Sequence, residues 1–232
     1  MADIAASLDH QGFCLVEGLL DDEQVQTLRD WFERGDLARS KRGGKTYGAR
    51  NLLAFTLIRE TATLPRVASC LLPVLGEHSR VVRGLFFDKV PGANWPVAWH
   101  QDLSLAVRHR YEIAGWDNWS MKSGVPHVQP PPEVLARMVT LRMHLDDCSP
   151  DHGALRVLPG SHRSGRLSRE AIRASAEAPA ATITARAGDG LLMRPLLLHA
   201  SSPAKNPSHR RVLHLEFAPH DLLPAPLEWA AT

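Results

Sequence analysis

The sequence has few cysteines and few lysines, and it contains no long apolar run. Its three cysteines, Cys14, Cys70 and Cys148, are odd in number and widely spaced. Such a set favours reduced thiols over a disulfide framework or a zinc site. No apolar run approaches the roughly 18 residues that a transmembrane helix needs. No Lys or Arg precedes Arg29, so the basic start of a signal peptide is missing. We therefore expect a soluble, cytoplasmic protein without a membrane partner.

The net charge is also small, at +2, and gives no reason to expect nucleic acid as a partner. The positive residues are 22 Arg and only 5 Lys. Arg offers a planar fork for carboxylates and phosphates, but a compositional habit of the genome explains the bias equally well. With 44% hydrophobic and 22% charged residues, the composition is that of a globular protein. The length suits a single domain over residues 1–232 and leaves the oligomeric state open.

The early part of the chain has helical patterns. Asp21 and Gln24 form a capping pattern at a helix start. An apolar stripe follows at helical spacing, made of Val25, Leu28 and Phe32. The pattern predicts an amphipathic helix after a short strand over residues 12–16.

A second helix is predicted over residues 64–75, with Thr63 as its cap and Pro65 in its first turn. Between the two helices, residues 38–51 are basic and glycine-rich and are typical of a loop. This loop is either a solvated connection or an anion-contacting segment to which Arg50 contributes.

From residue 82 onward, short strand-like runs separated by Gly and Pro replace the helical pattern. They cover residues 82–90, 103–107, 138–146, 181–187, 191–194, 196–200 and 212–217. Helices followed by many short strands predict an α+β, mainly β, fold with a sandwich or jelly-roll core. Residues 108–132 are predicted to be irregular, and a loop of that length is either functional or poorly ordered.

Two of these runs alternate between apolar and polar residues. In the first, one face holds Thr140, Arg142, His144 and Asp146. In the last, one face holds Arg210, Val212, His214 and Glu216. Polar faces of this kind either meet solvent or line a polar cavity inside a barrel.

Three pairs of a histidine and a carboxylate two residues apart occur in the chain: His100/Asp102, His144/Asp146 and His214/Glu216. In an extended segment, side chains at i and i+2 share a face. A neutral imidazole and a carboxylate on one face can hold a divalent metal from two corners. A further histidine would complete the 2-His-1-carboxylate set of non-haem Fe(II) oxygenases. The chemistry of the pairs alone does not choose among them.

His199, at the end of an apolar run, is a candidate for that further histidine. Arg210 begins the next strand-like run. A hairpin between these runs would bring the Arg210 guanidinium to the pocket of His199. A bidentate Arg suits the remote carboxylate of a 2-oxo acid better than a Lys would.

Four stretches of the chain together carry a family resemblance. They are HQD at 100–102, DHGALRVLPGSH at 151–162, GDG at 188–190, and the spacing from His199 to Arg210. The second matches the pattern G-x-L-x-V-x-P-G-S-H. With them the chain resembles the phytanoyl-CoA dioxygenase (PhyH-like) family of Fe(II)/2-oxoglutarate-dependent oxygenases, over nearly its whole length.

The resemblance implies a double-stranded β-helix (jelly roll, cupin-like) with flanking N-terminal helices. It implies that His100, Asp102 and His199 are the catalytic set that binds Fe(II). It also implies that Arg210 binds the remote carboxylate of 2-oxoglutarate, with Arg211 as the alternative if the register shifts by one. The other two His-x-acid pairs then face the cavity without binding metal.

Further cosubstrate contacts implied by the resemblance are Ser201, Arg142 and Leu85, although many family members carry an aromatic residue at the Arg142 position. The implied reaction uses O2 to convert 2-oxoglutarate to succinate and CO2 and to hydroxylate an unactivated C–H bond of a small-molecule substrate. Related halogenases have a small residue in place of Asp102, so a carboxylate there indicates hydroxylation. Nothing marks a coenzyme A thioester as the substrate.

Residues 108–132 would then lie where a lid is expected. Trp116 and Trp119 could cover an apolar part of a substrate, Lys122 could meet an anion, and His127 could assist. The alternative is an ordinary loop with buried tryptophans. Two other functions stay open: a non-catalytic binding protein of the same fold, and a cupin-like metalloenzyme that does not use 2-oxoglutarate.

Overall fold

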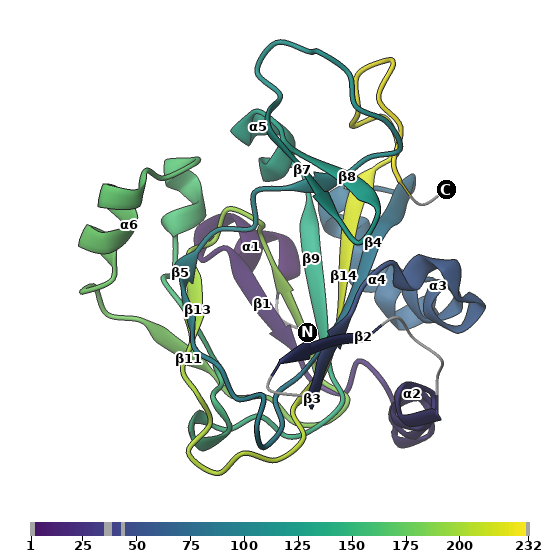
Figure 1. Ribbon diagram of the computed structural model, residues 1–232, viewed down its shortest axis with the longest axis vertical. Helices are drawn as coiled ribbons and strands as arrows, with labels where there is room; N and C mark the ends of the chain where they lie inside the picture. Colours follow the sequence, from purple (N-terminus) through teal and green to yellow (C-terminus); the bar gives the residue numbers. More distant parts are fainter. Residues whose placement is uncertain (1–2, 35–38, 43–44, 231–232) are drawn as a thin grey trace.

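Two antiparallel sheets face each other across the centre of the molecule (Figure 1). The computed structural model describes residues 3–34, 39–42 and 45–230. The larger sheet has the strand order β1 (Phe13–Val16), β12 (Gly190–Met193), β9 (Val139–His144), β14 (Arg211–Pro219), β4 (Ser79–Asp88), β3 (Lys45–Ala49), β2 (Arg39–Arg42). The smaller has the order β11 (Ala181–Ile183), β10 (Leu155–Val157), β13 (His199–Ser201), β5 (Val97–His100). These two sheets confirm the predicted jelly-roll class.

A third, small sheet and most of the helices surround this core. The small sheet has the order β6 (Leu105–Ala106), β8 (Val125–Gln129), β7 (Asp117–Lys122). The N-terminal helices are α1 (Ile4–His10), α2 (Asp22–Arg34), α3 (Thr56–Ala62) and α4 (Pro65–Leu75). Two short helices follow, α5 (Pro132–Ala136) and α6 (Arg169–Ser175). No helix among the described residues is long and apolar enough to cross a membrane.

Helix α2 begins at the capping pattern that the sequence predicts. The Asp21 N–H donates to Gln24 Oε1 at 3.1 Å, and the Gln24 N–H donates to Asp21 Oδ1 at 2.8 Å. Its apolar stripe packs on the larger sheet, where the ring of Phe32 stacks on Phe86 with centroids 3.7 Å apart. The helix is therefore fixed at its start by hydrogen bonds and along its length by apolar burial.

The prediction for Thr63 was wrong. The helix over residues 64–75 exists as α4, but its N-cap residue is Leu64 and no side chain caps it. Thr63 instead ends α3, a helix that the sequence patterns did not predict. The Thr63 hydroxyl donates to the Glu60 carbonyl at 3.0 Å. A threonine at a junction of two helices can satisfy the end of the first in place of the start of the second.

Both stretches predicted to be irregular contain hairpins. Strands β2 and β3 pair within residues 38–51, and β3 adds to the edge of β4; residues 38, 43 and 44 lie outside the described part. Gly48 permits this close pairing, because a Cβ there would lie 2.8 Å from the Phe86 carbonyl oxygen. Strands β7 and β8 form the hairpin within residues 108–132. These strands are rich in polar residues, so they lack the alternation that marks a half-buried strand.

The alternation of apolar and polar residues in β9 and β14 is confirmed, and the two faces of these strands lie in different environments. The apolar faces pack against the helices in one cluster with α2 and α4, through Val139, Leu141, Met143, Leu213, Leu215 and Phe217. The polar faces point between the sheets, where Arg142 and His214 lie opposite each other in register. The reading of a polar interior is therefore correct for both strands. The runs predicted at 181–187 and 196–200 form only the shorter strands β11 and β13.

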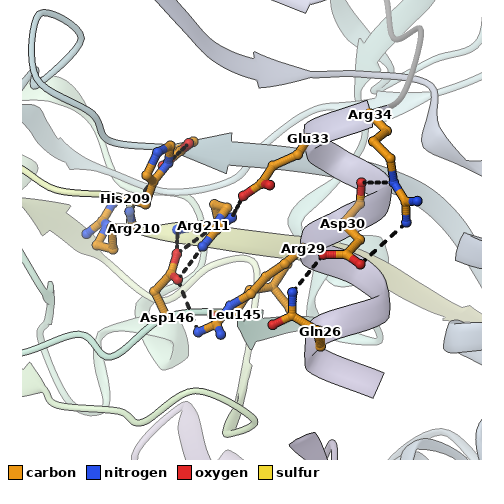
Figure 2. A network of polar contacts seen from close by, with 11 residues as sticks. Gln26, Arg29, Asp30, Glu33, Arg34, Leu145, Asp146, His209, Arg210 and Arg211 are labelled. Atoms are coloured by element: carbon orange, nitrogen blue, oxygen red, sulfur yellow. Dashed lines mark hydrogen bonds and ion pairs between the residues drawn. The ribbon is translucent and has the colours of Figure 1, made fainter. Parts of the chain in front are cut away.

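Asp146 departs from this alternation because β9 ends at His144. Its carboxylate lies beside α2 and accepts hydrogen bonds from the Arg211 backbone N–H, Nε and Nη2 at 2.8, 2.9 and 2.8 Å (Figure 2). Arg29 adds an ion pair at 3.2 Å, and Arg211 also binds Glu33 at 2.6 Å. Burial alone would raise the pKa of Asp146, but the bonds from Arg211 outweigh it and lower the pKa. The network joins α2 to the start of β14.

We expect Asp146→Ala to lower the free energy of unfolding by about 3–5 kcal/mol, because it leaves the buried Arg211 guanidinium without its main partner. Urea unfolding measures the change. Asp30→Ala is the matched control: its ion pair with Arg34 lies on the exposed side of the same helix, and we expect a loss below about 1 kcal/mol. Equal losses in the two variants would contradict the structural role of Asp146.

Candidate metal and cosubstrate site

Three potential metal donors meet at the ends of β5 and β13. The two strands pair so that His100 lies opposite His199. Asp102 follows β5, and its N–H donates to the Pro195 carbonyl at 2.9 Å. One ligand atom from each of the three residues lies within 4.8 Å of the others. Gln101, between two of them, points the other way and bonds the Gly165 and Leu196 carbonyls at 2.8 and 2.7 Å. These bonds fix the segment and keep residues 100 and 102 on one face.

The surroundings of both imidazoles favour the tautomer that leaves Nε2 free to bind a metal. Nδ1 of His100 lies 2.8 Å from the Ala98 carbonyl, and Nδ1 of His199 lies 2.8 Å from the Leu197 carbonyl. A carbonyl oxygen only accepts, so each Nδ1 carries the proton and each Nε2 presents a lone pair. The two Nε2 atoms lie 3.9 and 3.8 Å from the oxygens of Asp102.

The charges of the site suit a divalent cation. Burial would raise the pKa of Asp102, but His199, His214 and His100 outweigh it and lower the pKa to about 2. Burial lowers the pKa of His199 to about 4, against the pull of the Asp102 charge. At neutral pH the site therefore holds a carboxylate and a neutral imidazole. Asp102 Oδ2 is buried and has no hydrogen-bond partner among the described residues. Two imidazole nitrogens beside such an oxygen fit a non-haem Fe(II) ion.

A cavity of about 360 Å³ lies between the sheets beside these donors. All the site residues predicted from the sequence line it: His100, Asp102, His199, Arg210, Ser201, Arg142 and Leu85. Larger hollows lie on the outer surface beside α4, but their linings contain none of these residues. The chemistry therefore points to the inner cavity.

One end of the cavity is strongly cationic. Arg210 donates through Nη1 to the Gly153 carbonyl and through its backbone N–H to Asp88 at 3.1 Å. Arg142 donates to Nδ1 of His214 at 3.1 Å. The Nε atoms of both arginines are buried without a hydrogen-bond partner in the described part of the chain. Two guanidinium groups with unused donors in one cavity are suited to a dicarboxylate.

Lys89 also lies at this end, and the sequence patterns did not single it out. It is 1% exposed, and its ammonium donates to Ser201 Oγ at 3.1 Å and to the Ser202 carbonyl at 2.7 Å. Burial, with Arg210 and Arg142 nearby, lowers the pKa of Lys89 to about 7. The signal in the sequence was a lone lysine at the end of an apolar strand.

Arg211, the alternative anchor, does not reach the cavity. Figure 2 shows its side chain between Asp146 and Glu33, on the side of α2. Consecutive residues of a strand point to opposite faces, so the register that places Arg210 in the cavity turns Arg211 away from it.

The other two His-x-acid pairs have no third metal donor beside them among the described residues, in contrast to His100 and Asp102. Glu216 binds Arg83 at 2.9 Å. His144 is 2% exposed, and both of its ring nitrogens are without a described hydrogen-bond partner. Burial, with Arg142 and Arg210, lowers the pKa of His144 to about 3.

Of the four candidate substrate contacts within residues 108–132, only Lys122 lines the cavity. Trp116 is buried in an apolar cluster, Trp119 packs at its edge beneath Arg110, and His127 is 2% exposed. The alternative of buried tryptophans is therefore correct for Trp116.

Residues 151–162 fix the position of β13, the strand of the smaller sheet that begins at His199. They contain β10, which pairs with β13 so that Val157 lies opposite His199. Ser161 Oγ accepts from the Leu198 N–H at 2.8 Å. Gly153 has φ +69° and packs so closely that a Cβ would lie 2.5 Å from the Ser202 carbonyl oxygen. This turn therefore sets the position of both His199 and Arg210.

Comparison with known proteins agrees with this geometry. Residues 8–212 match the family described as Phytanoyl-CoA dioxygenase (PhyH). No protein in the curated set matches the sequence. Similar solved structures include AviO1 from Streptomyces viridochromogenes Tue57, with 22% identity, a TM-score of 0.68 and 97% of each chain covered. HygX from Streptomyces hygroscopicus, crystallised with nickel and 2-oxoglutarate, has 18% identity and a TM-score of 0.69 over 95% of this chain and 88% of its own.

A third similar structure is SnoN, a non-haem α-ketoglutarate-dependent epimerase from nogalamycin biosynthesis. It has 20% identity and a TM-score of 0.66 over 97% of this chain and 83% of its own. At these identities the structures show a shared fold. The family match covers most of the sequence, so the chain belongs to the phytanoyl-CoA dioxygenase (PhyH) family, and its chemistry is of the iron- and 2-oxoglutarate-dependent class.

The depressed pKa of His144 makes stability fall in acid. Above about pH 6.5 the residue is neutral in both states. Between pH 6.5 and about 3, His144 binds a proton in the unfolded chain but not in the folded chain. Each pH unit in that window therefore removes about 1.4 kcal/mol of stability for this residue.

We expect His144→Gln to reduce the acid slope of the unfolding free energy by about that amount. Urea titrations of metal-free protein between pH 6 and 4.5 measure it. His109→Gln, on the exposed surface, should keep the wild-type slope. An unchanged slope in His144→Gln would show that the buried imidazole is already protonated in the fold.

Proposed function

We propose that this chain is an Fe(II)/2-oxoglutarate-dependent dioxygenase that hydroxylates an unactivated C–H bond of a small molecule and releases succinate and CO2. One observation carries the proposal: two imidazole Nε2 atoms and a carboxylate converge in a cavity whose far end holds buried cations. The first group suits Fe(II), and the second suits the remote carboxylate of a dicarboxylate cosubstrate. The geometry thus supports both partners at once.

In this proposal His100, Asp102 and His199 hold Fe(II), which with 2-oxoglutarate and O2 supplies the oxidising power for C–H cleavage. The residues of the chain do the rest. The Ala98 and Leu197 carbonyls keep each Nε2 unprotonated. The low pKa of Asp102 keeps its charge available over the physiological range. Because these three residues are the donors that the described part of the chain brings together, Fe(II) held there would have coordination positions left for cosubstrate and oxygen.

Arg210 and Ser201 would bind the remote carboxylate of 2-oxoglutarate, with Lys89 beside them. Ser201 is oriented by its bond from Lys89 at 3.1 Å, and Arg210 by the Gly153 carbonyl. Arg142 lies further along the same cavity wall, and Leu85 packs opposite His214 on the neighbouring strand. A dianion at this end would pair with cations whose burial is otherwise unfavourable, because they have lost their hydration.

We predict that Asp102→Ala abolishes 2-oxoglutarate turnover while the fold survives, because it removes one of three metal donors. Wild-type protein with Fe(II) under 18O2 should place one labelled oxygen atom in succinate, and a processed substrate should gain the other. Asp151→Ala, at an exposed carboxylate paired with Lys205, is the matched control and should retain turnover. Full turnover in purified Asp102→Ala would overturn the metal assignment. A converted substrate without added oxygen would indicate an epimerase-type reaction.

For Arg210→Ala we predict a loss of 2-oxoglutarate affinity of about 10- to 100-fold, the size expected for charge-assisted hydrogen bonds. Metal binding should be preserved, since Arg210 donates no metal ligand. Calorimetric titration of the metal-loaded protein measures both. Arg211→Gln should show the reverse pattern, with reduced thermal stability and unchanged 2-oxoglutarate affinity. If Arg210→Ala keeps full affinity, the anchor is Arg142 or Lys89.

A further inference from the structure

We propose that the substrate of this enzyme carries an anionic group, a carboxylate or a phosphate, which binds Lys122 and Arg83 at the end of the cavity opposite Lys89. The inference rests on the proposed function, because it assigns this end to the substrate and the Lys89 end to 2-oxoglutarate. It identifies a binding site and a substrate class, and it concerns residues with no part in metal binding.

The register of the larger sheet places cations at both ends of the cavity. Along β4, Arg83 lies opposite Glu216 and Leu85 lies opposite His214. Arg83, Leu85 and Lys89 all line the cavity. At about 3.3 Å per residue, the backbone positions of Arg83 and Lys89 are roughly 20 Å apart. One small dicarboxylate held at Lys89 therefore leaves the Arg83 end for another molecule.

The cations at this second end form a cluster around Ser104. Arg83 Nη1 donates to the Ser104 carbonyl at 3.3 Å, and Lys122 Nζ donates to Ser104 Oγ at 2.8 Å. Ser104 comes two residues after Asp102, so both cations lie near the candidate metal. Arg50 lines the same cavity, and its neighbour Asn51 bonds the Ser123 carbonyl at 3.2 Å, next to Lys122.

The charges of the cavity call for an anion in addition to 2-oxoglutarate. Besides Arg50, five cationic side chains and two carboxylates line it. A divalent metal and the 2-oxoglutarate dianion cancel each other. Asp102 and Glu216 offset only part of the rest, and the ion pair with Glu216 is made by Arg83. Among the described residues, no carboxylate lies within ion-pair distance of Lys122.

The environment of Lys122 shows the same imbalance. Burial and the charges of Arg83 and Arg50 lower the pKa of its ammonium group, and the charges of Glu216 and Asp102 offset only part of this shift. A half-buried ammonium group beside other cations is costly unless an anion pairs with it. An anionic substrate would supply that partner, and Leu103 and Phe87 in the same lining would contact an apolar body.

The test uses protein loaded with Ni(II) as a redox-inert stand-in for Fe(II) and saturated with 2-oxoglutarate, so that the Lys89 end is filled. Phenyl phosphate, benzoate and phenol are titrated by calorimetry as probes with one shared ring. We expect at least one of the two anions to bind about tenfold or more tightly than phenol. The tighter of the two identifies the anion as a phosphate or a carboxylate.

Lys122→Gln should weaken binding of that anion about tenfold and leave phenol binding unchanged, whereas Lys122→Arg should keep the affinity within about threefold. Arg173→Gln, at an exposed arginine on α6, is the matched control and should bind as the wild type does. Equal binding of anions and phenol, binding of neither anion, or full anion affinity in Lys122→Gln would each overturn the proposal. Thermal unfolding of each variant confirms that it is folded.

The proposed function can fail separately. Binding of Ni(II) and 2-oxoglutarate is measured first in the same preparation, and turnover is measured with Fe(II). Absence of these activities would contradict the oxygenase assignment. If Ni(II) and 2-oxoglutarate bind but turnover is absent, the oxygenase assignment fails while the anion titration and the Lys122 variants still test the second end of the cavity. If 2-oxoglutarate does not bind, the assignment of the two ends, and with it this proposal, is overturned.

Discussion

The pairing of β5 with β13 is the constraint on which the rest of the site depends. It places His100 opposite His199, two residues that are far apart in the sequence. On its other side β13 pairs with β10, and the turns around β10 fix the strand through Ser161 and Gly153. The candidate metal centre therefore depends mainly on the smaller sheet and on the segment that follows β5.

The larger sheet supplies the electrostatic half of the site. Its outer face is apolar and stabilises the fold by packing against α2 and α4. The inner face can therefore carry charged side chains. Arg142 and Arg210 lie there with unused donors, and Lys89 completes the group from the end of β4. Such an interior is unfavourable for an empty protein. Its cations are compensated when anionic ligands enter, which links binding to stability.

Sequence patterns predicted what depends on local periodicity. The two faces of β9 and β14 followed from alternation, and the start of α2 followed from Asp21 and Gln24. The hairpins within 38–51 and 108–132 were missed because their strands lack an apolar face. The placement of Thr63 failed because two helices share that junction.

The candidate site was predictable only where a motif added to the chemistry. Three His-x-acid pairs are equivalent by composition, and only the partner strand shows that His100 and Asp102 have a third donor beside them. Lys89 resembles a surface residue in the sequence. It is buried, and its ammonium group bonds Ser201 and Ser202, which lie more than a hundred positions away. Long-range pairings of this kind leave no mark in the local pattern.

The three-stranded sheet of β6, β8 and β7 is separate from the two sheets that carry the metal donors and the cosubstrate cations. Lys122 stands on this outer sheet, at the end of β7. In the proposed substrate site Lys122 is supplied by this outer sheet and Arg83 by β4 of the larger sheet, so the Lys122 side can change during evolution without altering the strands that carry the candidate metal donors. A hairpin of this kind is a natural place for members of the family to diverge in what they recognise.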